Sequence, residues 1–146
     1  MKTQIHSLAH WIEAHTVDEY LETARERPLG LKSNPDFHPL LREIRGLVPV
    51  AGDTWVKDID VTLEPGPSNH QGQQTHSHSQ WTAVFYVIPS SPIEVIEGGD
   101  QYLIQPAPGD VVIMPPGIEH RATANKSGSV RLSFAMLVEG QVPATS

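Results

Sequence analysis

Two histidines, His76 and His78, stand one residue apart at the start of the β-rich stretch THSHSQWTAVFYV, residues 75–87. On a strand their side chains point to the same face, with Cα atoms about 6–7 Å apart. At that separation both imidazoles can bind one ion at the roughly 2.0–2.1 Å typical of metal–imidazole bonds. The pair therefore predicts two ligands of a metal site, and a third ligand must come from elsewhere in the chain.

The third candidate ligand is His120, in the stretch PGDVVIMPPGIEHRATAN. It follows a predicted strand, residues 110–114, and a turn at residues 115–117. A hairpin of this kind can return the chain beside the first strand and direct His120 to the same point. A single histidine is more simply a surface or hydrogen-bonded residue. An H-x-H pair with a third histidine after a strand and a turn favours a metal site.

The composition restricts the partners and the chemistry. The chain has 10 Lys and Arg against 17 Asp and Glu, a formal net charge of −7, so neither nucleic acid nor an anionic membrane is expected as a partner. The absence of cysteine excludes disulfides, thiolate-bound zinc and iron–sulfur clusters. The longest apolar runs, AVFYVI and VVIM, end at proline after six and four residues, far short of a membrane span. The sequence predicts a soluble, cytoplasmic protein with one site for a small-molecule substrate.

Two regions of the chain differ in their patterns. Apolar residues recur at helical spacing from Ser7 to about Arg45, and Thr16 and Glu19 have the spacing of a capping box, so two or three short helices are expected. From residue 54 short β-rich segments alternate with turn residues, which is typical of a sandwich or barrel. The expected organisation is a helical segment over residues 1–50 packed on the barrel, a barrel over 51–140 and a tail over 141–146. The predicted strands are 54–64, 76–88, 93–97, 101–105, 110–114, 118–124 and 129–138.

Two stretches resemble the two motifs of the cupin superfamily, the double-stranded β-helix proteins. They are HSHSQWTAVFYV and GGDQYLIQPAPGDVVIMPPGIEHRA, and the resemblance covers residues 58–138. The spacing of the second motif is matched by Gly109, Pro115, Gly117 and His120. The resemblance implies a mainly β jelly-roll barrel with short N-terminal helices. Cupins carry a glutamate four or five residues after the second histidine, where this chain has Thr82 or Ala83, so the resemblance implies a metal site of three histidines.

The same fold carries the Fe(II)- and 2-oxoglutarate-dependent oxygenases, and the chain is similar to these as well. Their pattern is His-x-Asp/Glu, a distal His and then Arg-x-Ser, which His76, His120 and the segment Arg131-Leu132-Ser133 match in order. His78 stands where the oxygenases have an acidic residue. The resemblance implies that Arg131, with Ser133, binds the far carboxylate of 2-oxoglutarate, a ligand that suits a guanidinium fork. An alternation of Arg and Ser with apolar residues is also what a half-exposed strand shows, so both interpretations stay open.

Strand alternation puts Gln80, Thr82 and Tyr86 on the face of the histidine pair, where they would line the pocket. Imidazole ligands suit iron, zinc, nickel and copper, and the resemblance favours Fe(II) with dioxygen. These features predict a mononuclear, non-haem Fe(II) dioxygenase or oxygenase of the cupin or 2-oxoglutarate type, acting on a small molecule or a side chain.

Two alternatives stay open. One is a non-catalytic module of the same fold that serves ligand binding, assembly or structure, which the missing first-motif glutamate favours. The other is a three-histidine zinc site that acts as a Lewis acid. For any of these functions the resemblance also implies a homodimer or a larger assembly.

Overall fold

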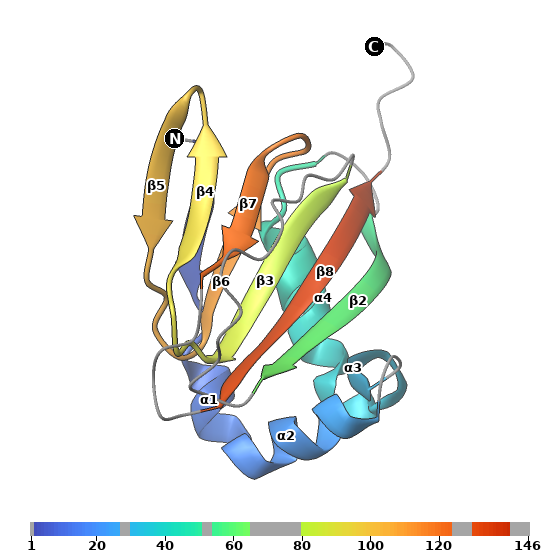
Figure 1. The fold of residues 1–146 in the computed structure, drawn as a ribbon. Coiled ribbons are helices and arrows are strands. Elements are labelled where there is room, and N and C mark those ends of the chain that lie inside the picture. The colour runs from blue at the N-terminus through green and yellow to red at the C-terminus, as the bar shows by residue number, and fades with distance from the viewer. Residues whose placement is uncertain (1, 27–29, 51–53, 65–79, 124–129, 141–146) are drawn as a thin grey trace.

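The computed structural model describes residues 2–26, 30–50, 54–64, 80–123 and 130–140 of the chain. Within these residues the chain forms two antiparallel sheets, with helices packed along one face of the larger sheet (Figure 1). None of these helices is long and apolar enough to cross a membrane. In chain order the elements are β1 (Gln4–Ser7), α1 (His10–Ala14), α2 (Val17–Arg25), α3 (Gly30–Ser33), the 3-10 helix η1 (Pro35–Phe37), α4 (His38–Leu47), β2 (Thr54–Glu64), β3 (Trp81–Ile88), β4 (Ile93–Glu97), β5 (Asp100–Ile104), β6 (Asp110–Met114), β7 (Glu119–Ala122) and β8 (Arg131–Gly140).

The strands form two sheets, between which the chain crosses several times. The larger sheet has the order β1-β6-β3-β8-β2 and the smaller one the order β5-β4-β7, and all of these neighbours pair antiparallel. Strands far apart in the chain, such as β3 and β8, are direct neighbours because the chain crosses repeatedly from one sheet to the other. This arrangement is a jelly roll. The predicted fold class, a mainly β double-stranded β-helix with short N-terminal helices, is confirmed.

Alternation along β3 separates two hydrophobic cores. Ala83, Phe85 and Val87 pack against the helices, whereas Val84 and Tyr86 pack between the two sheets. A strand that is buried on both faces reads as a nearly continuous apolar run, which explains the sequence WTAVFYVI. The core between the sheets is the interior of the barrel, and the side chains on this side of each sheet form its inner face.

Most predicted strands coincide with observed ones. β2, β4 and β6 have the predicted bounds, and β5, β7 and β8 differ from them by one or two residues at their ends. The predicted strand 76–88 is observed from Trp81, and residues 76–79 lie outside the described residues. The expectation of a purely helical segment over residues 1–50 is wrong in one respect, because β1 pairs with β6 in the larger sheet. The four residues of β1 include only one apolar side chain, so their sequence shows no strand periodicity. This strand forms because its backbone can pair with β6 at the edge of the larger sheet.

The entry of the chain into β1 is held by the carboxylate of Glu97, at the end of β4. It accepts hydrogen bonds from the backbone N–H of Lys2 at 2.5 Å, the backbone N–H of Thr3 at 3.0 Å and the Thr3 hydroxyl at 2.9 Å. Burial favours the neutral acid, but these three donors favour the ionised form and together lower the pKa of Glu97 below its ordinary value. The ionised carboxylate of Glu97 therefore connects the residues before β1 to β4 of the smaller sheet.

Changing Glu97 to glutamine is expected to destabilise the protein in a pH-dependent way. Because the pKa of Glu97 is lower in the folded chain, its contribution to stability is fully present above the ordinary glutamate pKa and is lost as the pH falls through the folded value. We expect the urea midpoint of Glu97→Gln to lie below that of the unmodified protein near neutral pH and the two midpoints to converge under acid conditions. Glu22→Gln, at an exposed position of α2, is the control. If the difference between the two urea midpoints stayed constant with pH, the contribution of Glu97 could not come from its negative charge.

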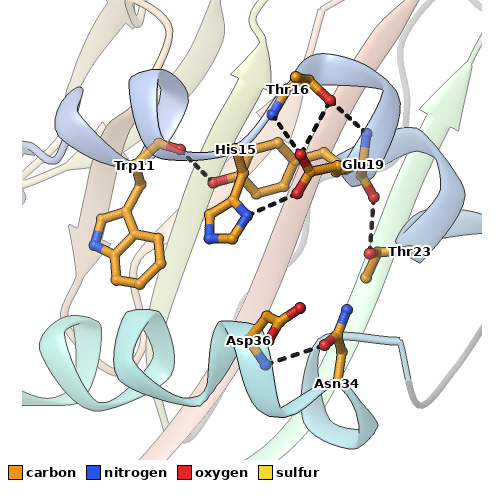
Figure 2. A network of polar contacts seen from close by, with 8 residues as sticks. Trp11, His15, Thr16, Glu19, Thr23, Asn34 and Asp36 are labelled. Carbon is orange, nitrogen blue, oxygen red and sulfur yellow. Dashed lines mark hydrogen bonds and ion pairs between the residues drawn. The ribbon is translucent and has the colours of Figure 1, made fainter.

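The helices are joined to one another by a polar and aromatic cluster (Figure 2). Thr16 and Glu19 form the predicted capping box at the start of α2, which is confirmed. The Tyr20 hydroxyl donates to the backbone carbonyl of Trp11 at 2.7 Å, and the Tyr20 ring lies 5.8 Å from that of Phe85 and 6.4 Å from that of Phe134. These contacts support β3 and β8, the strands that carry the predicted site residues Thr82, Tyr86, Arg131 and Ser133, from outside the barrel.

Candidate functional site

Cross-strand pairing brings three of the predicted site residues together on the inner face of the larger sheet. Residues directly opposite each other in an antiparallel pair point to the same side, with Cβ atoms about 4.5–5.5 Å apart. Tyr86 of β3 is opposite Ser133 of β8, and Tyr86 belongs to the core between the sheets. Arg131 lies two residues before Ser133 and shares its face, while Leu132 and Phe134 belong to the core under the helices. The pairing of β3 with β8 thus places Tyr86 on the same face as Arg131 and Ser133.

Arg131 is buried at the start of β8, with 3% of its surface exposed. Its Nη1 donates to the Ser91 hydroxyl and to the backbone carbonyl of Thr123, the latter at 2.6 Å. The alternative that this segment is a half-exposed strand is wrong, because Leu132 and Phe134 on the other face are fully buried as well. A guanidinium stays charged when buried, and its planar fork matches the geometry of a carboxylate. The residue paired directly with Arg131 in the ladder of β2 and β8 is Glu64.

The Tyr86 hydroxyl is the second polar group of this cluster. Burial raises the pKa of Tyr86 far above its ordinary value, and the nearby Arg131 charge opposes that shift only in part. The phenol is therefore protonated at every physiological pH and can donate a hydrogen bond. Its strand is fixed by Gly109, whose N–H donates to the Tyr86 carbonyl at 2.7 Å.

Gly109 of the second motif has a steric reason to be glycine. Its φ is +86°, and a Cβ at this position would lie 2.6 Å from the Cα of Ala9. Its carbonyl accepts a hydrogen bond of 2.9 Å from the Leu8 N–H. The close approach of the N-terminal segment thus excludes any side chain at this turn.

His120 lies on the inner face of the opposing sheet. It is opposite Val95 in the pairing of β7 with β4, and Val95 belongs to the core between the sheets. A turn closed by a hydrogen bond from Ile118 N–H to the Pro115 carbonyl, with Gly117 at φ +81°, brings the chain into β7. The predicted order of strand, turn and histidine is observed, but the expected hairpin beside the strand of the histidine pair is wrong. β6 and β7 lie in different sheets, and β7 pairs with β4.

The imidazole of His120 is oriented by its own backbone. Nδ1 lies 3.3 Å from the Ile118 carbonyl oxygen, and since a carbonyl only accepts, Nδ1 carries the proton in this hydrogen bond. The lone pair of the neutral ring is then on Nε2. Histidines that bind metals commonly have one ring nitrogen held in this way while the other is the ligand. This tautomer fits the predicted role of His120 as a metal ligand.

The other two predicted ligands, His76 and His78, lie outside the described residues. Among the residues that the structure describes, no group of three His, Cys, Asp or Glu side chains could hold a metal ion. The site of three histidines therefore stays a prediction. In the described part of β3, the positions where cupins carry the glutamate are Thr82 and Ala83, both buried.

Gln80 and Thr82 extend the inner face toward the start of β3. Thr82 is buried opposite Leu137 of β8 and Met114 of β6. Gln80 Nε2 donates to Glu139 Oε1 at 3.3 Å. Thr82 thus lies among apolar neighbours, whereas Gln80 lies beside a carboxylate that the sequence analysis did not single out.

The sequence analysis also missed Ser91 and Thr123, which both accept hydrogen bonds from Arg131. Ser91 stands 40 residues from Arg131 in the chain, in the turn segment PSSP between β3 and β4. Serine in a turn is common enough to carry no signal of its own. The contact arises only because the jelly roll brings this turn, the end of β7 and the start of β8 together.

No protein-family model matches the chain, and no curated protein matches it. Among solved structures it is similar to a Pseudomonas putida prolyl-4-hydroxylase, with a TM-score of 0.58, 15% identity, and coverage of 96% of this chain and 88% of that one. It is also similar to the non-haem alpha-ketoglutarate-dependent carbocyclase SnoK from nogalamycin biosynthesis, with a TM-score of 0.65, 15% identity, and coverage of 77% and 61%.

A third similar structure is an oxidoreductase of the 2OG-Fe(II) oxygenase family from Burkholderia pseudomallei, with a TM-score of 0.57, 12% identity, and coverage of 76% of this chain and 55% of that one. The chain thus spans 55% and 61% of the length of two of these proteins. At such identities the similarity concerns the fold. The chain has the double-stranded β-helix fold that its sequence predicted.

Proposed function

We propose that the chain is a non-haem, metal-dependent oxygenase of the Fe(II)/2-oxoglutarate type that acts on a small molecule or a side chain. The observation that carries the proposal is the buried guanidinium of Arg131, which shares the inner face of the barrel with Ser133 and Tyr86. His120 faces the same interior from the opposing sheet. A carboxylate anchor on one sheet and a candidate metal ligand on the other are the two parts that such a site needs.

Each polar group has a separate task in this proposal. The guanidinium fork of Arg131 binds a carboxylate of 2-oxoglutarate, and the hydroxyls of Tyr86 and Ser133 donate hydrogen bonds to it. The raised pKa of Tyr86 keeps its proton available for this bond. The apolar side chains of Val84, Val112 and Met114 line the same core and exclude water from the reacting groups.

The prediction of His76, His78 and His120 as metal ligands belongs to this proposal. Iron held by imidazoles, when bound, supplies the redox chemistry with dioxygen. The Nδ1 hydrogen bond of His120 holds the ring so that Nε2 is the ligand. The donor set also fits zinc, nickel and copper, so the identity of the metal is a matter for measurement.

The specific observation that favours a non-catalytic module is the buried, neutral pair Thr82 and Ala83, which stands where a first-motif carboxylate would bind the metal. A module of this kind could still bind a carboxylate at Arg131. It would differ from an oxygenase in lacking a stoichiometric metal.

The two functions are separated by metal analysis of the purified protein followed by anaerobic titration with Fe(II) and 2-oxoglutarate. For an oxygenase we expect one Fe(II) per chain and a new visible absorption band when 2-oxoglutarate is added. Absence of a stoichiometric metal would support the non-catalytic module. Binding of Fe(II) without an optical or calorimetric response to 2-oxoglutarate would keep the metal site and refute the use of this co-substrate.

A further inference from the structure

We propose that Ser91 is a positioning residue that holds the Arg131 guanidinium in the orientation needed to receive a carboxylate. This inference rests on the proposed function, since the ligand is the carboxylate of 2-oxoglutarate. Ser91 lies in the turn between β3 and β4, and only 6% of its surface is exposed, so the side chain is buried. It acts on the ligand only through the arginine.

Three groups form a closed triangle of hydrogen bonds. Arg131 Nη1 donates to the Ser91 hydroxyl and, at 2.6 Å, to the Thr123 carbonyl. The Ser91 hydroxyl in turn donates to the same Thr123 carbonyl at 3.2 Å. A hydroxyl has one donor and two acceptor sites, so Ser91 accepts from the arginine and donates to Thr123 at the same time. The triangle fixes both the position of Nη1 and the plane of the guanidinium.

The triangle also connects the arginine to the strand of the candidate metal ligand. Thr123 directly follows β7 and stands three residues after His120. Its N–H and its hydroxyl both donate to the Pro92 carbonyl, at 3.2 Å and 2.6 Å. The turn at Ser91 and Pro92 therefore holds the end of β7 and the start of β8 together, so that Arg131 and the His120 strand cannot shift independently.

A fixed guanidinium binds its ligand more tightly than a mobile one. Ordering a long charged side chain costs rotamer entropy. In this chain that cost is met during folding, so it is not subtracted from the free energy of ligand binding. Removing the Ser91 hydroxyl restores part of the freedom of Arg131 without touching the charge.

The neighbouring residue provides a matched control. The Ser90 hydroxyl donates to the Val130 carbonyl at 2.8 Å, one residue before Arg131, and no described contact joins Ser90 to the guanidinium. Ser90→Ala and Ser91→Ala each remove one hydroxyl from the same turn, with one described hydrogen bond lost in the first variant and two in the second. Only the second variant changes the contacts of the arginine.

The test measures the dissociation constant of 2-oxoglutarate for the Fe(II)-loaded protein under anaerobic conditions. We expect Ser91→Ala to raise it about tenfold, the effect of one hydrogen bond to a charged group, and Ser90→Ala to change it by less than about twofold. Fe(II) affinity should be the same in both variants. Two results would overturn the proposal. If 2-oxoglutarate binding were weakened equally in both variants, the turn would act only through the stability of the protein. If binding were not weakened in Ser91→Ala, the Ser91 hydroxyl would have no effect on the ligand.

A second measurement keeps the positioning role separate from the proposed function. In ¹⁵N-labelled protein without metal, the Nη signals of Arg131, assigned with Arg131→Lys, should show restricted rotation in the unmodified chain and in Ser90→Ala, and fast rotation in Ser91→Ala. If the unmodified protein binds no 2-oxoglutarate but this pattern holds, the proposed co-substrate is wrong and the positioning of Arg131 stands. Restricted rotation that persists in Ser91→Ala would refute the positioning itself.

Discussion

Replacing Arg131 with glutamine is expected to weaken 2-oxoglutarate binding by at least about a hundredfold, because a bidentate, charge-assisted contact is lost from a buried position. Glutamine retains a planar polar group of moderate size but neither the charge nor the fork. The dissociation constant is measured by anaerobic calorimetry on the metal-loaded protein. Circular dichroism and the melting temperature show whether the variant is folded, since the oxygens of Ser91 and Thr123 lose their donor.

Arg121 offers the matched control for this experiment. It lies on β7 and forms an ion pair with Glu94, with its Nη2 2.8 Å from the Glu94 carboxylate. Its partner in the pairing of β4 with β7 is also Glu94, next to the inward-facing Val95, so the pair lies on the outer face of the smaller sheet. Arg121→Gln should leave 2-oxoglutarate binding unchanged. If Arg131→Gln bound as tightly as the control, the carboxylate site could not be at Arg131.

Replacing His120 with alanine is expected to lower the affinity for Fe(II), or for Co(II) as its substitute, by at least about a hundredfold, because one of three ligands is removed. The effect follows from the inward-facing position of His120 and from the Nδ1 hydrogen bond that leaves Nε2 as the ligand atom. Titration of the metal-free protein with Co(II), followed by its visible absorption, measures the loss. This variant tests the metal site without reference to any substrate.

His6 is the corresponding control histidine. It pairs with Val111 of β6, whose side chain belongs to the core under the helices, so His6 lies on the face of the sheet that points away from the barrel interior. Its Nε2 is 2.9 Å from the Gln4 side-chain oxygen. His6→Ala should bind Co(II) as the unmodified chain does. Equal affinity in His120→Ala would show that His120 is not a ligand.

Much of the barrel was predictable because its signals are local. Proline and glycine mark the ends of β4 and β6, and those bounds were predicted correctly. The common face of Arg131 and Ser133 follows from the two-residue repeat of a strand, which needs no knowledge of the fold. Gly109 and Gly117 take positive φ values in turns, where glycine is favoured for a steric reason.

The rest depends on contacts between distant parts of the chain. Local alternation does not tell whether the face of Arg131 and Ser133 meets water or a second sheet, so burial of both faces of β8 was left open by the sequence. The hydrogen bond from Arg131 to Ser91 joins residues 40 positions apart, and β1 exists only because β6 pairs with it. Such features follow from the complete topology, and no short pattern contains them.

The burial of β8 on both faces also determines which changes in chain length the protein can tolerate. Arg131 and Ser133 alternate with Leu132 and Phe134, and a shift of one residue moves every side chain of a strand to the opposite face. A slip of β8 by one residue would turn the Arg131 guanidinium toward the core under the helices and Phe134 toward the barrel interior. A buried charge without a partner costs several kcal/mol, so the slipped pairing is disfavoured by the same arginine that forms the site.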